Sequence, residues 1–145
     1  MTRERAPSGR DGTSRDRADG ARAGRGRRSE RAGRRAEFLA ALRLRLCGWR
    51  VLARRLKTPA GEIDLLVRRG RVVAIVEVKR RPDRMAAGEA VMPAQRRRLA
   101  GAAAWVLGQG ARIGAGGVDC LRFDLVWVDR LGLPHHLPDA WRLDP

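Results

Sequence analysis

Aromatic residues are scarce in this chain of 145 residues. It contains four Trp and two Phe residues, and it has no Tyr. Proteins that bind single-stranded nucleic acid without sequence preference stack the bases on exposed aromatic rings. So few rings argue against a stacking platform of that kind.

Cysteines and long apolar runs are also few. The two cysteines, Cys47 and Cys120, have a spacing that fits neither a metal-binding nor a redox motif. The longest apolar runs, VVAIV and AAAWVL, are far shorter than the roughly 20 residues that a membrane-spanning helix needs. The N-terminus has no apolar segment of the signal-peptide type. We therefore expect a soluble, cytoplasmic protein that has no membrane partner.

Acidic residues are outnumbered two to one by basic residues. Lys and Arg together number 32 and Asp and Glu number 16, which gives a formal net charge of +16. An excess of this size favours an anionic partner, and nucleic acid is the first candidate, ahead of an anionic membrane surface or an acidic protein. All but two of the basic residues are arginine, which binds phosphate in a bidentate manner.

The N-terminal segment lacks the residues that build a core. Residues 1–36 contain no Leu, Ile, Val, Phe or Trp, and they hold 12 Arg and five acidic residues. Such a segment cannot bury enough apolar surface to offset the entropy cost of ordering it. We predict a disordered basic tail over residues 1–32, which is either a solvated leader or a phosphate-binding arm, followed by one domain over residues 33–145.

From Gly33 onwards the pattern is that of a folded α/β domain. The apolar residues Phe38, Leu39, Leu42 and Leu46 fall on one helical stripe, so we expect a helix that buries this stripe and ends at Gly48. A second helix is expected over residues 93–108, and the strands are expected over residues 49–56, 61–68, 71–79 and 118–128. The chain end is rich in turn residues and is expected to be anchored by Trp141. The order helix, three strands, helix, strand predicts one small domain with a mixed central sheet flanked by helices.

The third predicted strand ends on two charged residues. Side chains alternate along a strand, so Glu77 and Lys79 share one face while Val76 and Val78 share the other. If Arg69-Gly70 is a two-residue turn, Glu62 lies opposite Glu77. Asp64 and Glu77 are then diagonal neighbours, with β-carbons within roughly 7–8 Å.

Two carboxylates at this separation can share a divalent cation. Oxygen ligands without a nearby Cys or His favour Mg²⁺ or Mn²⁺ over zinc. Lys79, on the same face, can neutralise a phosphate oxygen or orient a water molecule. Asp64, Glu77, Lys79 and a metal are together what phosphodiester hydrolysis requires. The alternative is a solvated strand face that carries an ordinary Glu–Lys pair.

Several motifs in register resemble a known family. "GEIDLL" followed by "VEVKRR" looks like the core of the PD-(D/E)XK nuclease superfamily, and more closely the chain resembles the YraN family, which is related in fold to Holliday-junction resolvases. The resemblance runs from about Gly33 to Val128 and includes "GRRAEFLAALRLRLCGWRVL", "EAVMPAQRRRL" and "RFDLVWV". It implies a restriction-endonuclease-like fold, metal ligation by Asp64 and Glu77, and a catalytic role for Lys79.

The resemblance also draws attention to three further residues. The resolvase relatives use a Glu from the first helix, which matches Glu37, but the periodicity places Glu37 nearly opposite the apolar stripe, where an exposed residue in the first turn is the alternative. Glu62 matches the family pattern and could equally support a metal ligand. Gln95 stands where the family usually has Lys. It lies one turn before Leu99 on the inner side of the second helix, so we expect it to hydrogen-bond toward the site or to a substrate phosphate.

Other polar residues have simpler interpretations. Asp124 and the pair His135-His136 are expected to be structural or surface residues. Basic residues around the site would make sequence-independent phosphate contacts. Those contacts are assigned to Arg54, Arg55, Lys57, Arg80, Arg81, Arg84 and Arg96–Arg98, of which Arg96, Arg97 and Arg98 are expected to point away from the carboxylates.

These observations predict a metal-dependent, endonuclease-like protein that acts on duplex or branched DNA. The alternative is a non-catalytic nucleic-acid-binding or assembly module that retains the nuclease fold. A third interpretation, a basic ribosome-associated or membrane-associated protein, would rest on the tail alone. A homodimer is expected only from kinship with the resolvases.

Overall fold

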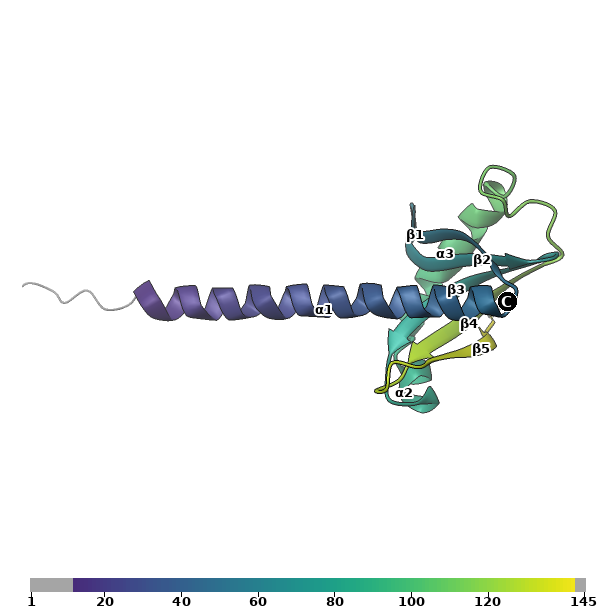
Figure 1. The fold of residues 1–145 in the computed structure, drawn as a ribbon. Coiled ribbons are helices and arrows are strands. Elements are labelled where there is room, and N and C mark those ends of the chain that lie inside the picture. The colour runs from purple at the N-terminus through teal and green to yellow at the C-terminus, as the bar shows by residue number, and fades with distance from the viewer. Residues whose placement is uncertain (1–11, 143–145) are drawn as a thin grey trace, which may run out of the picture. The chain divides into compact units, whose positions relative to one another are not determined.

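Five strands form a single sheet in the computed structural model, which describes residues 12–142. The strands are β1 (Arg50–Thr58), β2 (Gly61–Arg69), β3 (Val72–Arg80), β4 (Cys120–Val128) and β5 (Pro134–Trp141). They lie side by side in chain order (Figure 1). β3 and β4 run parallel, whereas the other neighbouring strands run antiparallel. The predicted fold class, a small α/β domain with a mixed sheet, is confirmed.

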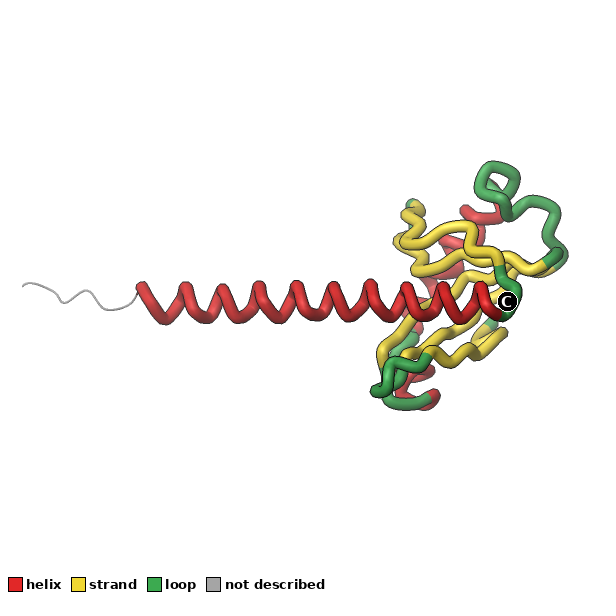
Figure 2. Tube along the Cα trace, viewed as in Figure 1, coloured by secondary structure: helices red, strands yellow, loops and turns green. Residues whose placement is uncertain are grey.

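Within residues 12–142, three helices accompany the sheet; Figure 2 draws the helices in red. They are α1 (Gly12–Leu46), α2 (Arg84–Glu89) and α3 (Pro93–Gly108). α3 covers the predicted residues, and Pro93 occupies its first turn, where a missing N–H costs nothing. The short helix α2 was not predicted; the carboxylate of Asp83 caps it by accepting a hydrogen bond from the Ala86 N–H at 2.9 Å. Within residues 12–142, no helix is long and apolar enough to cross a membrane.

Helix α1 begins at Gly12, well before the start expected near Gly33. By its internal contacts the chain divides into two units that meet between Ala32 and Gly33. Residues 12–32 are helical, which is compatible with their content of Arg and Ala, both good helix formers that extend an existing helix at little cost. Residues 1–11 lie outside the described residues. The disordered tail over residues 1–32 stays a prediction.

The second unit buries a different face of α1 from the one expected. Ala40, Ala41 and Leu44 are buried against the sheet, whereas Phe38 and Leu42 are 54% and 43% exposed. The predicted stripe of large apolar residues is therefore wrong. Helix-to-sheet distance depends on the size of the side chains between them, and alanine lets the helix approach closely.

The sheet separates two hydrophobic clusters. On one face, Leu65, Ala74 and Val76 pack against α1. On the other face, Leu66 and Ile75 pack with residues of α2 and α3. Figure 1 shows the part of α1 that belongs to the second unit, residues 33–46, in front of the sheet and α3 behind it. The predicted alternation along β3, with Val76 and Ile75 on opposite faces, is confirmed.

The β2–β3 hairpin turns one residue later than expected. Leu65 pairs with Val76 and Arg69 pairs with Val72, so the turn is Gly70-Arg71, with Gly70 at a φ of 60°. The prediction that Glu62 lies opposite Glu77 is therefore wrong. Extending the observed register by one residue places Asp64 directly opposite Glu77, and not diagonal to it. Gly70 can occupy either position of a two-residue turn, so the local sequence is compatible with both Arg69-Gly70 and Gly70-Arg71. The pairing of β2 with β3 decides between the two.

The C-terminal segment, expected to consist of turns, includes strand β5. It pairs with β4 and is an edge strand, so Pro134 and Pro138 interrupt no ladder on its outer side. Trp141 is buried and stacks on Phe123, with ring centroids 5.5 Å apart. This contact confirms that Trp141 anchors the chain end.

Candidate active site

The candidate site lies where β2 and β3 separate. Their pairing runs from Arg69–Val72 to Leu65–Val76 and no further among the described residues, although both strands continue. β2 stays paired with β1, and β3 stays paired with β4. The sheet therefore opens as a fork, and the next residues along its two arms are Asp64 and Glu77.

Glu77 is buried at this fork, with 3% of its surface exposed. Its Oε1 accepts a hydrogen bond from Lys79 Nζ at 2.6 Å and another from Gln95 Nε2. The face shared by Glu77 and Lys79 is thus the face that α3 covers. The structure places Gln95 toward the site, as its position one turn before Leu99 predicted.

Asp64 bridges the two arms of the fork. Its Oδ2 accepts a hydrogen bond from the Val78 N–H at 2.8 Å, which takes the place of a backbone bond between the strands. Burial, followed by the negative charge of Glu77, raises the pKa of Asp64 to about 7, although the Val78 N–H and Lys79 act in the opposite direction. Asp64 and Glu77 are therefore electrostatically coupled neighbours.

Glu37 approaches the same fork from α1. It falls on the stripe that continues through Ala40, Ala41 and Leu44, so it belongs to the packing side of the helix and not to the opposite side. Burial raises the pKa of Glu37, and its charge in turn contributes to the raised pKa of Asp64. The alternative of a fully solvated Glu37 is wrong, because it relied on the wrong apolar stripe.

Arg98 is a site residue that the sequence interpretation missed. Its Nη2 lies 3.8 Å from Glu77 Oε2, and its Nη1 donates a hydrogen bond to the backbone carbonyl of Glu62. The expectation that Arg98 points away from the carboxylates is wrong. Its spacing was the available signal: Arg98 follows Gln95 by three residues, and residues three apart lie on the same side of a helix.

Glycine at position 61 makes room for Arg98. A β-carbon on Gly61 would stand 2.7 Å from Arg98 Cδ, and Gly61 has a φ of 130° that other residues rarely adopt. On α3, a β-carbon on Gly101 would stand 2.9 Å from the β-carbon of Ala60. The two glycines allow α3 to approach the β1–β2 turn closely, which brings the Arg98 guanidinium within reach of Glu77.

Glu62 lies outside the fork, on the β1 side. It pairs with Lys57 in the sheet, and its carboxylate accepts a hydrogen bond from Arg55 Nε at 3.1 Å. Arg55 has a φ of 50°, a strained value for a residue with a side chain. The Arg55 cation also acts on Glu37 and Asp64. Glu62 therefore positions a cation near the site, which matches a supporting role.

The residues at the fork fit a hard divalent cation. Oε2 of Glu77 and Oε2 of Glu37 are buried and accept no hydrogen bond. Within residues 12–142, no three His, Cys, Asp or Glu side chains are spaced to hold a metal ion by themselves. Mg²⁺ commonly takes one or two protein carboxylates and keeps several waters. The pair Asp64 and Glu77 suits that chemistry.

A comparison with known proteins identifies the family. A model of "Uncharacterised protein family UPF0102" matches residues 36–128, a range that includes every carboxylate and donor at the fork. The chain belongs to this family. The resemblance to the YraN family is thereby confirmed.

UPF0102 relatives match most of the chain. The UPF0102 protein of Parvibaculum lavamentivorans is 58% identical over 112 residues, which cover 77% of this chain and 82% of the relative. That of Caulobacter vibrioides is 49% identical over 125 residues, covering 86% of this chain and 97% of the relative. That of Granulibacter bethesdensis is 47% identical over 120 residues, covering 83% and 74%. These names state the family alone, so the activity is argued from the site.

Three of the other predicted nucleic-acid contacts of this UPF0102 chain lie next in sequence to the fork residues Lys79 and Gln95. Arg80 and Arg81 follow Lys79 at the end of β3 and are exposed. Arg96 is exposed on α3. Among the described residues, none of the three forms an ion pair with a carboxylate of the fork. They remain predicted phosphate contacts.

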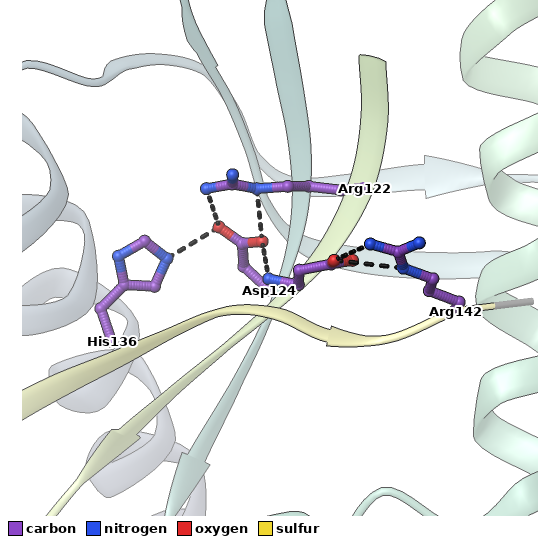
Figure 3. A network of polar contacts seen from close by, with 5 residues as sticks. Arg122, Asp124, His136 and Arg142 are labelled. Carbon is purple, nitrogen blue, oxygen red and sulfur yellow. Dashed lines mark hydrogen bonds and ion pairs between the residues drawn. The ribbon is translucent and has the colours of Figure 1, made fainter.

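A second polar cluster joins β4 to β5 and involves the residues expected to be structural. Asp124 is fully buried and accepts hydrogen bonds from Arg122 at 2.9 and 3.1 Å and from the Asp139 N–H at 2.9 Å. His136 Nε2 lies 2.7 Å from Asp124 Oδ2 (Figure 3). Burial acts to raise the pKa of Asp124, but these partners together hold it below its usual value. The cluster has the contacts of a structural element, as expected.

Proposed function

We propose that this protein is a metal-dependent, endonuclease-like enzyme that hydrolyses phosphodiester bonds in DNA, including structured or branched DNA. The observation that carries the proposal is the fork itself, where Asp64, Glu77 and Lys79 gather with Glu37. Acidic groups with raised pKa values beside a cation are typical of catalytic sites. The PD-(D/E)XK motif supports the same chemistry.

Each residue at the fork has a distinct role in this proposal. Asp64 and Glu77 hold the cation, Mg²⁺ or Mn²⁺. When bound, such an ion supplies Lewis acidity and lowers the pKa of a coordinated water. Gln95 and Arg98 fix the orientation of the Glu77 carboxylate by their contacts. Lys79 uses one of its three protons on Glu77 and offers the others to a phosphate oxygen or to a water.

Glu37 is suited to proton exchange at the same place. Its buried Oε2 has no hydrogen-bond partner, and burial raises its pKa. A carboxyl group with a raised pKa keeps its proton to a higher pH than an exposed Glu does, and it can release that proton when a cation arrives. Glu37 therefore belongs to the proposed active site as an acid–base group.

A cleavage assay with a matched control tests the proposal. Purified protein should cleave labelled junction, flap or nicked DNA in the presence of Mg²⁺ or Mn²⁺, and Asp64→Ala should abolish cleavage. Asp119→Ala is the control, because Asp119 is an exposed carboxylate paired with Arg71 at the start of β4, away from the fork. Cleavage that persists in Asp64→Ala, or that is lost equally in Asp119→Ala, contradicts the assignment.

One observation favours the alternative, a nucleic-acid-binding or assembly module without turnover. Glu77 already has Lys79, Gln95 and Arg98 around its carboxylate, which compensates its charge without a metal. Calorimetric titration of Mn²⁺ separates the two functions. The enzyme should bind the ion, and Glu77→Ala should lose that binding, whereas the module should bind DNA independently of Asp64, Glu77 and added metal.

A further inference from the structure

Three arginines gather in a hollow at the carboxyl ends of β3 and β4. The hollow has a volume of about 250 Å³. Its lining residues are Arg80, Arg81, Pro82, Val128, Asp129 and Arg130. The three arginines are exposed, so their charged ends are accessible to a ligand. The hollow is separate from the carboxylates of the fork, which do not line it.

The charge of the hollow is incompletely compensated. Asp129 is the one acidic residue in its lining, and its carboxylate is already occupied. Asp129 Oδ1 accepts hydrogen bonds from the Leu131 and Leu133 N–H groups at 2.8 and 3.0 Å, and His135 Nε2 lies 2.8 Å from Oδ2. Among the described residues, no acidic side chain forms an ion pair with Arg80, Arg81 or Arg130. An anion would reduce their mutual repulsion.

The backbone holds the hollow in shape. Arg80 pairs with Val128 across the parallel strands, and the Arg81 N–H donates to the Val128 carbonyl at 3.2 Å. Arg81 Nη1 also donates to the Arg80 carbonyl at 2.7 Å, and Pro82 restricts the backbone of Arg81, the residue before it. Two of the three arginines therefore stand on a paired strand end and not on a free loop.

The position of the hollow suits a ligand that also reaches the fork. In open α/β sheets, ligands bind outside the carboxyl ends of parallel strands. Arg81 follows Lys79 by two residues, roughly 6.6 Å along an extended chain. This is close to the axial rise of about two phosphates on one strand of a DNA duplex.

We propose that this hollow binds a backbone phosphate of DNA, one or two nucleotides from the phosphate at Lys79. Guanidinium groups bind phosphate oxygens in a bidentate manner. The contact is made to the backbone, so it carries no base preference. This inference rests on DNA as the ligand in the proposed function, but it requires no cleavage.

Binding measurements on the full chain in EDTA test the inference without involving the proposed metal. The affinity for a short labelled DNA duplex is measured over a series of KCl concentrations. Arg130→Ala should lower the affinity about three- to tenfold and reduce the slope of log K against log salt by about one. Arg80→Ala should act in the same direction. Thermal unfolding of each variant checks that the fold is kept.

Arg142→Ala is the matched control. Arg142 is also an exposed arginine, but its guanidinium is bound by Asp139 at 2.6 Å (Figure 3). This variant should keep the affinity within about twofold. An unchanged salt slope in Arg130→Ala, or an equal loss in Arg142→Ala, overturns the inference.

The same variants separate DNA from other sources of phosphate. Vesicles that contain phosphatidylserine present phosphate groups on a membrane surface. If Arg130→Ala abolishes vesicle binding and leaves DNA binding unchanged, the hollow is a lipid site and the inference is wrong. Because none of these measurements requires cleavage, a protein that binds DNA through the hollow but cuts nothing would contradict the proposed function alone.

Discussion

At the scale of single residues, Asp64 is the group whose chemistry depends most on its surroundings. Its bond to the Val78 N–H favours the ionised carboxylate, while burial and Glu77 favour the protonated form. The second influence is larger, so the pKa rises to about 7. A group with this pKa is divided between its two forms at neutral pH, and binding of a cation would release its proton.

The raised pKa predicts how stability depends on pH in the metal-free protein. The folded chain keeps the Asp64 proton up to about pH 7, whereas the ordinary value for the group is 3.8. Between pH 3.8 and about pH 7 the unfolded state binds fewer protons than the folded state. The free energy of unfolding should therefore fall as the pH rises through this range, by at most about 1.4 kcal/mol per pH unit. Asp64→Asn should reduce this slope. Urea denaturation in EDTA at several pH values measures it, and an unchanged slope in the variant would assign the effect to another group.

The contacts of Arg98 predict that it contributes more to the stability of the fold than its neighbour Arg97 does. Arg98→Ala removes the partner of the Glu62 carbonyl and one cation beside the buried Glu77. We expect the free energy of unfolding to fall by roughly 1–3 kcal/mol, as for the loss of hydrogen bonds to charged groups. Arg97 is exposed, so Arg97→Ala should change it by less than about 0.5 kcal/mol. Urea denaturation of the two variants compares them, and equal losses would exclude a specific contact.

At the scale of elements, the packing of α1 decides where Glu37 lies. The helix contacts the sheet through Ala40, Ala41 and Leu44, and Glu37 continues the same stripe by one turn. If Phe38 and Leu42 faced the sheet instead, the helix would be rotated and Glu37 would point to solvent. The contribution of α1 to the site is therefore a consequence of packing by small residues.

Two leucines of α1 test this packing directly. Leu44 is fully buried, so Leu44→Ala should lower the free energy of unfolding by roughly 2–5 kcal/mol through lost burial and the cavity that it leaves. Leu42 is 43% exposed, so Leu42→Ala should cost less than about 1 kcal/mol. Both substitutions replace a leucine of α1 with alanine, so the change in helix propensity is the same in the two variants. A larger loss of stability in Leu42→Ala than in Leu44→Ala would contradict this packing and support the apolar stripe predicted from the sequence.

The fork is the other feature of element scale. β2 and β3 stop pairing after Leu65 and Val76, while each remains paired with its outer neighbour. Their separation leaves Asp64 and Glu77 without a regular ladder between them and admits groups from both faces of the sheet. Glu37 enters from the α1 side, and Gln95 and Arg98 enter from α3.

At the scale of the whole molecule, the positive charge is distributed over both parts of the sequence. Residues 1–32 hold ten arginines and five acidic residues, and residues 37–145 still carry a net charge of +9. The described core begins at Ala36. The tail is therefore expected to contribute to charge and not to the stability of the domain. Homodimer formation stays a prediction.

Deletion of residues 1–32 tests this division of roles. We expect the free energy of unfolding to change by less than about 1 kcal/mol, because no described core residue is removed. DNA affinity should fall uniformly across sequences, with a smaller salt slope, since phosphate contacts without base contacts are lost. Denaturation and salt-dependent binding measure the two effects. A complete loss of binding would instead support the interpretation that rests on the tail alone.

The sequence by itself determined the first four strands, the order of the main elements and the alternation along β3. Glu77 and Lys79 share a face because side chains alternate in any strand, and this property depends only on near neighbours in the chain. Asp64 and Gln95 were found through the family motifs, and the position of Gln95 one turn before Leu99 predicted the side of the helix on which it lies. Local periodicity is sufficient for such features because it is independent of partner elements.

The tertiary structure decided which face of α1 is buried, which residues form the hairpin turn and where Arg98 points. Each of these depends on how closely two segments approach, and that distance is set by the sizes of side chains on both. Alanines bring α1 onto the sheet, and Gly61 and Gly101 bring α3 onto the β1–β2 turn. The sequence named most residues of the fork, and packing between distant segments brought them together.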